Sequence, residues 1–577
     1  MDNREIARIL AETADLMEIA AEDGFRIRSY RNAASAIESF PESIWAMASD
    51  PGRNFTDVPG VGKGIAGVLK ELCERGSFEK RDHLLERFPA SALELLKIQG
   101  LGPKGIALIY QHFRVATIDD LERLCREQKL RDLPRMGAKL EEKVMRSIAQ
   151  YRQSAGRYLL SFGNKVAQEL IPYLQEGGGI EQISPAGSLR RGKETIGDLD
   201  LLVTSPNAAA TLDRFVTHPK VHEVLGKGEN KASVKFGLEG LQVDLRALPA
   251  ESYGAAMQYF TGSKDHNVQL RQRALKRGLT LNEYGLFTLE DNQRVAGATE
   301  EEIYERLGLA WIPPELRENS GELEAAEQRT LPRLVQLQEI RGDLHMHTTE
   351  TDGRATLQEM ADAARQLGYE YIAITDHSKA LAMANGLDET RAVAFAKQVR
   401  ELNRSGELGV QVFSGLECDI LRDGRMDLAE DALAELDFVI GSVHSFLNLE
   451  SAEMTDRLLR ALESPNLKLL GHPTGRQLLR REAYPFDFAR VVREAVKRGV
   501  RLEINGSPER MDLGSGYVRQ AKALGAKFAI STDSHHPKSL GVNMPYGVVM
   551  ARRGWLEAGD VLNTLPVEQF ANAIGKQ

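Results

Sequence analysis

The periodicity of apolar and polar positions changes along the chain and divides it into three stretches. Up to about residue 155, apolar residues recur at helical spacing, as do Ile6, Ile9, Leu10 and Met17. From residue 156 onward, short apolar runs typical of strands mix with helical segments. After residue 339, apolar runs alternate with amphipathic segments such as 357–368. The first stretch therefore predicts an all-α region and the last a parallel α/β barrel.

Two apolar runs in the middle stretch contain acidic residues. The run 196–203 reads IGDLDLLV and carries Asp198 and Asp200, and the run 241–248 carries Asp244. Burying a carboxylate without a partner is costly. Residues two apart on a strand point to the same face, so Asp198 and Asp200 converge on one point. A divalent cation compensates such a pair, and Asp244 on a neighbouring strand would complete a two-metal site.

The sequence GSLRRG at 187–192 stands just before the acidic pair. Gly187 and Ser188 can open a turn whose N–H groups and hydroxyl meet a triphosphate, while Arg190 and Arg191 supply cationic donors. An isolated pair of aspartates is weak evidence, because exposed acids are common. The combination of this turn, the pair and a third aspartate downstream resembles the motif of the nucleotidyltransferase superfamily, which implies nucleotidyl transfer.

Two glycine-rich turns recur in the helical stretch. The segments 58–69 (VPGVGKGIAGVL) and 98–109 (IQGLGPKGIALI) share an apolar–Gly–apolar–Gly turn that opens a helix. Such a turn presents backbone N–H groups where the helix dipole favours a phosphate, and glycine permits a close approach. Both resemble helix-hairpin-helix binders of the DNA backbone; the alternative is a plain turn between packed helices. The candidate DNA contacts are Gly60, Gly62, Gly100 and Gly102. A third segment, 133–144, keeps one glycine and matches weakly.

Seven of the twelve histidines lie between residues 345 and 536. Apolar runs in this stretch are followed by imidazoles and carboxylates, and barrel enzymes carry their functional residues at the C-terminal ends of strands. So many metal-binding groups exceed the needs of one ion and indicate two or three metals. The segments concerned are 342–353, 371–378, 412–419, 438–445, 469–473, 502–506 and 528–536.

Composition narrows the class of protein but does not identify a partner. The 577 residues are too many for one core. The net charge of −9 includes acidic residues that would bind cations, so it decides little about nucleic acid. No apolar run is long enough to span a membrane, and the charged N-terminus lacks a signal-peptide core. Cys73, Cys125 and Cys418 form no disulfide framework. We expect a cytoplasmic protein without a membrane partner.

Residues 1–320 resemble the family X DNA polymerases. The resemblance is carried by the turn and aspartates above, by 259–286, which is similar to the thumb of that family, and by 29–41 with the first glycine turn. It implies that Asp198, Asp200 and Asp244 hold two Mg²⁺ or Mn²⁺ ions that act on a primer 3′-hydroxyl and a dNTP. It also implies nucleotide contacts from Ser188, Arg191, Tyr259, Phe260, Gly262, Lys264, Asn267 and Arg271.

Two positions depart from the pattern of that family. Lys264 stands where DNA polymerase beta, a member of that family, has an acidic residue beside the nucleotide base. The resemblance therefore implies unusually tight nucleotide binding. Val68 stands at the position of the lyase lysine, and valine cannot form a Schiff base. Lys63 and Lys70 point to other faces of the same predicted helix. We therefore expect little or no 5′-deoxyribose-phosphate lyase activity.

Residues 339–577 resemble the polymerase and histidinol phosphatase (PHP) domain, a distorted barrel of about seven βα units. The resemblance implies nine metal ligands: His345, His347, Asp352, His377, Glu417, His444, His472, Asp533 and His535. Asp376, Glu503 and His536 are expected to support them or to be structural. Two or three Mn²⁺, Zn²⁺ or Fe²⁺ ions suit this mixture of imidazole and carboxylate.

Together the two resemblances cover nearly the whole chain and imply a bacterial family X DNA polymerase with a C-terminal PHP domain. We expect a monomeric, nucleoid-associated repair enzyme that fills short gaps, acts on gapped or primer-template DNA, and carries a 3′→5′ exonuclease. Abasic-site incision and 3′-phosphate removal are further candidate activities of the PHP site. The expected domains are a small helical gap-binding domain at 1–80, a second helical DNA-binding domain at 81–155, a nucleotidyltransferase palm at 156–255, a thumb at 256–318, a polar linker at 319–338 and the PHP domain at 339–577.

Three alternatives come from other functional classes. In the first alternative, the barrel is a small-molecule phosphatase of the histidinol-phosphatase type and the N-terminal half is a DNA tether. In the second, the palm is a template-independent nucleotidyltransferase. The third alternative is a non-catalytic DNA-binding scaffold, which two complete sets of metal-binding residues disfavour.

Overall fold

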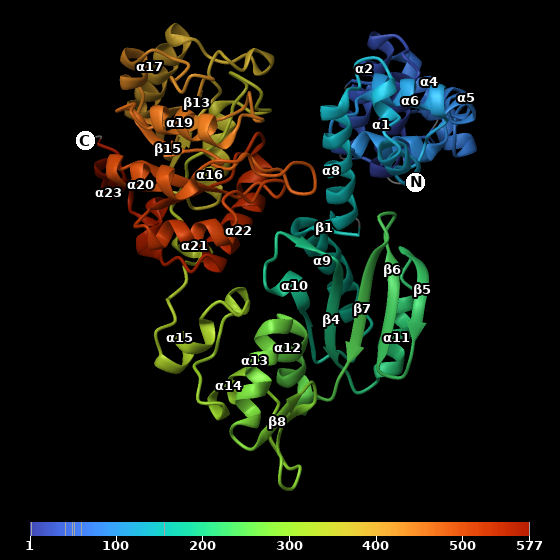
Figure 1. Cartoon of the computed structure of the whole chain (residues 1–577), viewed down its shortest axis with the longest axis vertical. Helices are drawn as coiled ribbons and strands as arrows, with labels where there is room; N and C mark the ends of the chain where they lie inside the picture. The colour runs from blue at the N-terminus through green and yellow to red at the C-terminus, as the bar shows by residue number, and fades with distance from the viewer. Residues whose placement is uncertain are drawn as a thin grey trace. The chain divides into compact units, whose positions relative to one another are not determined.

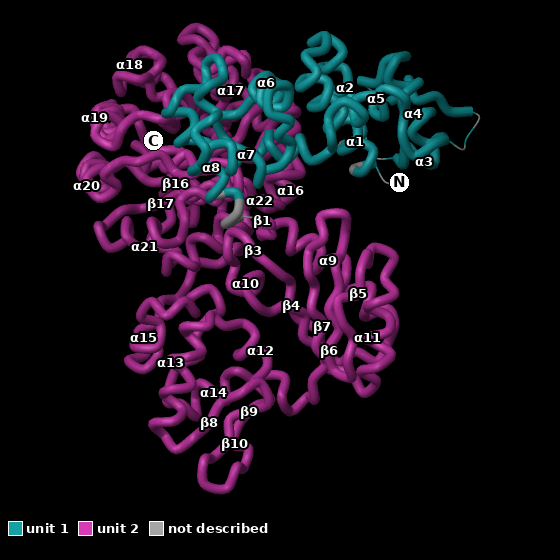
Figure 2. Tube along the Cα trace, turned by 45° about the vertical axis from the view of Figure 1, so that its right-hand side comes forward, with its two compact units in different colours: residues 1–155 teal, residues 156–577 magenta. Residues whose placement is uncertain are grey.

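The computed structural model of the chain describes residues 1, 3–40, 42–48, 50, 52–58, 60–154 and 156–575. The chain forms two compact units, Met1–Ala155 and Gly156–Gln577 (Figure 2). Each unit is described by itself below. Ala155, the predicted last residue of the second helical domain, lies outside the described residues. No described helix is both long and apolar enough to cross a membrane.

The first unit is helical, as its periodicity predicts. Its apolar stripes meet in one core that includes Ile6, Leu10, Leu69 and Ile106. The helices are α1 (Asn3–Ile19), α2 (Gly24–Ser39), α3 (Ile44–Met47), α4 (Lys63–Arg75), α5 (Glu79–Arg87), α6 (Pro103–Phe113), α7 (Ile118–Arg126) and α8 (Ala138–Ser154).

The three glycine-type turns of this unit share one backbone conformation. Gly60 and Gly100 have φ angles of 86° and 97°, a region that favours glycine. Two residues later, Gly62 and Gly102 are the N-caps of α4 and α6. In the third copy Arg135 takes the same place with φ 66°, two residues before Gly137 and helix α8. The weakly matching third segment therefore also turns into a helix.

The second unit begins with a five-stranded sheet, of which β4, β5, β6 and β7 are labelled in Figure 1. Its order is β2-β4-β7-β6-β5, and only the central pair, β4 and β7, is parallel. The strands are β2 (Gln182–Pro185), β4 (Asp198–Thr204), β5 (Val221–Lys227), β6 (Lys231–Phe236) and β7 (Leu241–Ala247). Helices α9 (Leu160–Glu176) and α11 (Ala208–Val216) contribute to its core, and the short α10 (Gly187–Arg190) precedes β4. Two further short strands, β1 (Tyr158–Leu159) and β3 (Thr195–Ile196), form a separate antiparallel pair.

A second small core follows the sheet. It is built from α12 (Tyr253–Thr261), α13 (Lys264–Leu275), α14 (Glu300–Arg306) and the sheet β8 (Leu279–Asn282), β9 (Gly285–Thr288) and β10 (Arg294–Ala296). The segment 319–338, expected as a polar linker, contributes to this core instead. It contains α15 (Glu322–Gln328), in which Ala326 and Glu322 are fully buried. The buried Glu322 is satisfied by His266, whose ring nitrogen lies 2.7 Å from it, a pairing that the polar composition of the segment concealed.

The C-terminal part is the predicted parallel barrel. Seven strands pair consecutively in parallel from β11 to β17. A parallel bridge between Met346 and Ser534 brings the ends of the first and last strands together, so the barrel is nearly closed. The strands are β11 (Gly342–Asp343), β12 (Tyr371–Ile374), β13 (Gln411–Asp419), β14 (Phe438–Ser442), β15 (Leu467–Leu470), β16 (Arg501–Asn505) and β17 (Phe528–Ser531). The helices are α16 (Leu357–Gln366), α17 (Glu389–Ser405), α18 (Glu430–Ala434), α19 (Ser451–Ala461), α20 (Phe488–Arg498), α21 (Ser515–Ala523), α22 (Pro537–Arg553) and α23 (Val567–Ala573).

Two candidate metal centres

The three aspartates of the five-stranded sheet come from its parallel central pair. Asp200 on β4 lies directly opposite Asp244 on β7, and Asp198 is two residues before Asp200 on the same strand. Gly187 lies against this group with φ 61°, and a Cβ built on it would be 2.7 Å from Asp200 Oδ2. A side chain at position 187 would therefore push into the carboxylate.

The charges of these aspartates are compensated unequally. Burial, followed by the charges of Asp198 and Asp244, raises the pKa of Asp200 to about 6. Burial opposes ionisation of Asp244 as well, but hydrogen bonds from Lys231, Ser233 and Gln242 lower its pKa overall. Lys231 Nζ lies 2.6 Å and Arg246 Nη2 3.6 Å from Asp244 Oδ2. Three acids on two paired strands, of which Asp200 has a raised pKa, fit divalent cations, which neutralise such a group.

The two arginines of the turn after Gly187 have different partners. Arg190, expected to meet the triphosphate, instead forms a bidentate ion pair with the buried Glu300 at 2.9 and 2.7 Å. Glu300 also accepts from the fully buried Arg317 at 2.6 Å. Arg191 lies beside Gly262, and its Nη1 donates to the carbonyl of Thr261. The structure therefore brings Arg191 and Gly262 together, while Arg190 ties the turn to α14.

The other predicted nucleotide contacts lie on α10, α12 and α13. Ser188 is on α10, next to Gly187. Tyr259 and Phe260 pack edge to face with ring centroids 5.1 Å apart, and Asn267 donates to the carbonyl of Tyr259 at 2.7 Å. Lys264 and Arg271, both on α13, are exposed.

The nine predicted ligands of the barrel lie in one cluster at the C-terminal ends of its strands. Eight of them form three groups whose ligand atoms lie within 4.8 Å of one another. Those groups are His347, Asp352, His377 and His535; His345, His347 and Asp533; and His377, Glu417 and His444. The ninth, His472, places Nε2 2.8 Å from Glu417.

Glu417 lies at the centre of this cluster. Its carboxylate is 2.9 Å from His377, 3.2 Å from His444 and 3.4 Å from His345. Although burial opposes ionisation, these imidazoles hold the pKa of Glu417 well below its usual value. A carboxylate contacted from several sides in this way is suited to bridging two cations.

The imidazoles differ in their protonation tendencies. Burial, with a further effect from His377, lowers the pKa of His347 to about 3. Burial opposes the charge of His377 and His444, but Glu417, together with Asp352 at His377 and Asp419 at His444, raises their pKa values to about 10 and 9. Within the described structure, His345 Nε2, both ring nitrogens of His347, His377 Nδ1 and His472 Nδ1 are buried without a hydrogen-bond partner. Buried lone pairs of this kind, converging with carboxylates, fit divalent cations.

Further carboxylates orient the ligands from outside. Glu503 accepts from His345 Nδ1 at 2.7 Å, and Asp376 accepts from Thr348 N and Oγ1 at 2.8 and 2.6 Å. Glu503 thus contacts a predicted ligand, whereas Asp376 contacts Thr348, and His536 is the N-cap of α22. Two supporting residues were missed. Asp419 contacts His444 Nδ1 at 2.8 Å, and Arg510 lies 3.4 Å from Asp533. The signal for Asp419 was its position two residues after Glu417 on one strand, which places both on the same face.

The position of the missing lyase lysine lies on α4 in the first unit. Val68 packs partly buried against the core of that unit. Lys63 and Lys70 are exposed on the same helix. The absence of lyase activity stays a prediction.

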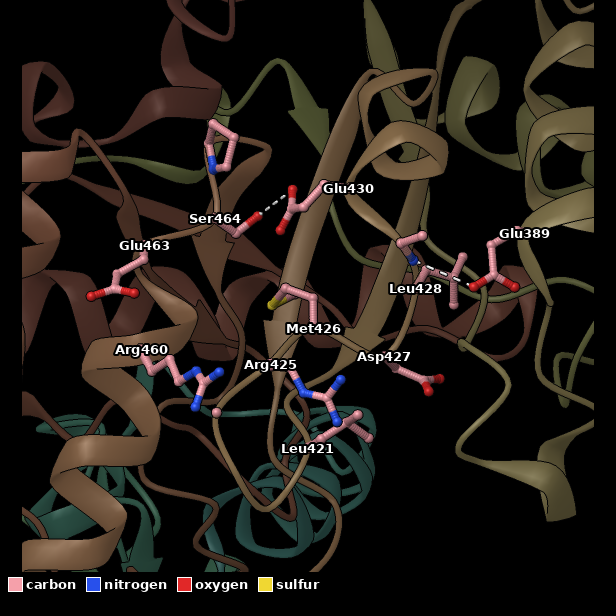
Figure 3. Close-up of a pocket in the computed structure, with 13 residues that line it drawn as sticks. Glu389, Leu421, Arg425, Met426, Asp427, Leu428, Glu430, Arg460, Glu463 and Ser464 are labelled. Carbon is pink, nitrogen blue, oxygen red and sulfur yellow. Dashed lines mark hydrogen bonds between the residues drawn. The ribbon is translucent and has the colours of Figure 1, made fainter.

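A separate pocket of the barrel contains none of the nine predicted ligands. It lies around the β13–α18 connection and α19, where Ser464 Oγ donates to Glu430 at 3.0 Å (Figure 3). Its labelled side chains include Glu389, Arg425, Asp427 and Arg460, so charges of both signs line it (Figure 3). The metal-binding residue types are instead gathered at the strand ends.

Comparisons with known proteins cover both the part of the chain that holds the three aspartates and the barrel. Sequence signatures match the DNA polymerase beta thumb at 256–318, a helix-hairpin-helix domain at 1–78, a SAM-like helix-hairpin-helix tandem at 92–150 and the PHP domain at 343–506. The DNA polymerase/3′-5′ exonuclease PolX of Bacillus subtilis (strain 168) is 36% identical over 98% of this chain and 97% of its own length. The chain belongs to the bacterial family X DNA polymerases with a C-terminal PHP domain.

Family membership confirms the fold class expected from the sequence. Eukaryotic family relatives match a shorter part of the chain. DNA polymerase lambda of Arabidopsis thaliana is 25% identical over 55% of this chain and 62% of its own length. DNA polymerase lambda of Rattus norvegicus is 26% identical over 51% and 53%. We refer below to residues 156–255 as the palm and 256–318 as the thumb, following the predicted boundaries.

Proposed function

We propose that the chain is a DNA-repair polymerase that adds dNTPs to primer 3′ ends in short gaps and removes 3′-terminal nucleotides in its PHP domain. The observation that carries this proposal is the presence of two separate, chemically complete centres in a chain related over nearly its whole length to a DNA polymerase/3′-5′ exonuclease. One centre is the carboxylate group of the palm; the other is the imidazole and carboxylate cluster of the barrel.

In the palm, the three aspartates hold divalent cations beside the turn at Gly187. Asp200 and Asp244 face each other across two strands, so their oxygens share one site. Ser188, Arg191 and Gly262 then bind the triphosphate, because they line the turn and the adjacent end of α12. Tyr259 and Phe260 lie along the sugar, with Asn267, Lys264 and Arg271 toward the base and template.

In the barrel, the nine ligands hold two or three divalent cations, and the family implies this use of metal. Glu417 and the other carboxylates would hold the cations together with the histidine nitrogens, and Glu503 and Asp419 would orient His345 and His444. Bound cations supply an activated water or 3′-hydroxyl and neutralise the leaving oxygen. Mg²⁺ or Mn²⁺ suits the all-oxygen palm, and Mn²⁺, Zn²⁺ or Fe²⁺ suits the mixed barrel site.

DNA is the expected macromolecular partner of both centres. The two helix-hairpin-helix matches and the thumb support DNA binding. We propose that Gly60, Gly62, Gly100 and Gly102 contact the DNA backbone, that dNTPs are the small substrates, and that the monomer works at the nucleoid. Abasic-site incision and 3′-phosphate removal would use the same barrel site.

The test is incubation of the protein with a labelled gapped DNA and Mn²⁺, with and without dNTPs. Extension with dNTPs and shortening without them is the expected result. Release of phosphate from histidinol phosphate without any cleavage of DNA would favour the small-molecule phosphatase, which the relatives do not support. Extension that ignores the template base would favour a template-independent transferase.

A further inference from the structure

Helix α22 of the PHP domain packs directly on the turn that carries Arg191. Gly192, next in sequence, has φ 67°, and a Cβ built on it would be 2.2 Å from Val549 Cγ1 on α22. Arg553, the last residue of α22, donates from Nη1 to the carbonyl of Arg191 at 2.6 Å. The backbone of the proposed phosphate-binding turn therefore rests on a helix of the other catalytic domain.

A single carboxylate links the two arginines. Glu318 accepts from Arg191 Nε at 3.1 Å and from Arg553 Nη1 at 3.1 Å. Lys193 Nζ lies 3.6 Å from its other oxygen. Burial opposes the charge of Glu318, but Arg191, Arg553 and Lys193 lower its pKa overall. Glu318 is thus an ionised acceptor held by cations of both domains, at the end of the thumb.

These contacts fix the guanidinium of Arg191. Its Nε is bound to Glu318 and its Nη1 to the carbonyl of Thr261, so two anchors set the plane of the group. Nη1 lies 3.3 Å from the position of a Cβ built on Gly262. Because the anchors use Nε and Nη1, Nη2 is the nitrogen they leave for an anionic ligand. A planar guanidinium held in advance loses less freedom when it binds a phosphate.

We propose that Glu318 and Arg553 are positioning residues of the nucleotide site, so the PHP domain contributes directly to dNTP binding by the palm. The inference rests on the proposed polymerase function. Glu318 holds Arg191 toward the triphosphate, and Arg553 holds both Glu318 and the backbone of the turn. Neither residue needs to touch the nucleotide.

The first test is Arg553→Ala in the full-length protein. It removes one donor to Glu318 and the donor to the Arg191 carbonyl, so Arg191 loses its fixed orientation. The KM for dNTP should rise about tenfold with a smaller change in kcat, the size expected for losing a charge-assisted hydrogen bond. Exonuclease activity should stay at the wild-type rate. Equilibrium binding of dNTP to a complex with a dideoxy-terminated primer should weaken by the same factor.

The adjacent Arg552 provides a matched control. It also lies on α22 and pairs with Glu315 at 2.7 Å, and it donates to the carbonyl of Val335 at 3.1 Å. Arg552→Ala removes the same side chain type from the same helix without touching Arg191 or Glu318. Its dNTP affinity should equal that of the wild type, and thermal unfolding of both variants checks that they fold.

Glu318→Gln is the second variant, because it keeps the shape but removes the charge. It should raise the KM for dNTP, and the double variant Glu318→Gln with Arg553→Ala should show less than the sum of the two free-energy changes. Arg553→Lys should restore part of the affinity through one contact to Glu318.

Two outcomes would overturn the inference. One is unchanged dNTP affinity in a folded Arg553→Ala protein that polymerises normally. The other is an equal loss in the Arg552→Ala control, which would indicate general docking of the domains rather than positioning of Arg191. If the wild-type protein itself adds no nucleotide, the proposed function fails instead, so the two failures are distinguishable.

Discussion

The barrel cluster and the palm aspartates hold their charges in different ways. In the barrel, the buried Glu417 is surrounded by His345, His377 and His444 within 3.4 Å, so acid and base lie in contact. In the palm, acids lie next to acids. Burial, followed by the charges of Asp198 and Asp244, raises the pKa of Asp200 to about 6, and Lys231 and Arg246 beside Asp244 oppose this rise. The predicted ligands of the barrel therefore stabilise one another's charges, whereas Lys231 and Arg246 compensate the palm aspartates only in part, since the pKa of Asp200 stays raised.

A second difference concerns what surrounds each centre. The barrel ligands are oriented by residues of the barrel itself, such as Glu503 and Asp419. The palm turn is oriented from outside, by Glu300 through Arg190 and by Arg553 through the Arg191 carbonyl. Substitutions outside the barrel should thus leave exonuclease activity unchanged, whereas substitutions outside the palm should lower polymerase activity.

The largest expected effect is the loss of nucleotide addition in Asp198→Ala or Asp244→Ala. Removing a carboxylate from a site made only of carboxylates should lower the rate of extension by at least about a thousandfold. The rate of shortening should stay close to that of the wild type, and both are measured on one gapped DNA. Near-normal extension by either variant would contradict the two-metal assignment.

The reciprocal change is His345→Ala together with His347→Ala. His345 and His347 belong to one group with Asp533, and His347 is shared with a second group, so at least two ion positions lose a donor. Shortening of DNA should fall by about a thousandfold or more while extension persists. Persistent shortening would mean that the nuclease lies elsewhere in the chain. Metal analysis of the purified double variant should show a lower bound-metal content than in the wild type.

An intermediate effect is expected from Glu300→Gln. This variant tests whether the palm turn, unlike the barrel cluster, depends on residues outside its own domain. The change leaves Arg317 buried without its carboxylate, a loss of about 3–5 kcal/mol in unfolding free energy. It also releases Arg190 and should reduce extension more than shortening. Thermal unfolding and both activities are the measurements, and equal losses of the two activities would contradict the proposed independence of the barrel.

The same pair predicts a pH dependence. Although burial opposes its charge, Arg317 and Arg190 lower the pKa of Glu300 from 4.5 to about 2. A lowered folded-state pKa gives stability that is present above pH 4.5 and is lost as the pH falls toward 2. The difference in unfolding free energy between wild type and Glu300→Gln should therefore shrink over that interval. A difference that stays constant would exclude ionised Glu300 as its source.

The smallest effect is expected in the helix-hairpin-helix turns of the first unit, which we propose to bind the DNA that both centres act on. Gly62 and Gly102 have negative φ angles and open space around a built Cβ, whereas Gly60 and Gly100 have positive φ angles that their turns require. Gly62→Val with Gly102→Val should thus fold, yet block the approach of a phosphate and weaken binding of gapped DNA about tenfold. Fluorescence anisotropy measures the affinity, and circular dichroism checks the fold. Unchanged affinity would leave these glycines as structural caps.

The sequence predicted best what local pattern encodes. Apolar runs broken by acids located β4 and β7, and repeated strand-end histidines located the barrel cluster. Contacts between segments that are far apart in sequence could not be predicted from such local patterns. Arg190 was expected at the triphosphate, but it pairs with Glu300. A local pattern does not show this pairing, because the two residues are 110 positions apart in sequence. The segment containing α15 has a polar composition, which does not show that Glu322 is buried against His266, 56 residues earlier, and accepts from the N–H groups of Asn319 and Ser320.

Closure of the barrel also sets the order in which the two centres become complete during synthesis. The first strand pairs early with β12, but its closing contacts come late: Asp343 accepts from Thr532, 189 residues further on, and His347 N donates to the carbonyl of Ser534. Ribosomes deliver the chain from its N-terminus, and domains fold as they emerge. A nascent chain halted before residue 533 carries all three palm aspartates but lacks Asp533, His535 and Arg553. The polymerase part is therefore translated before the barrel can close, and before Arg553, which we propose to position Arg191, has been added to the chain.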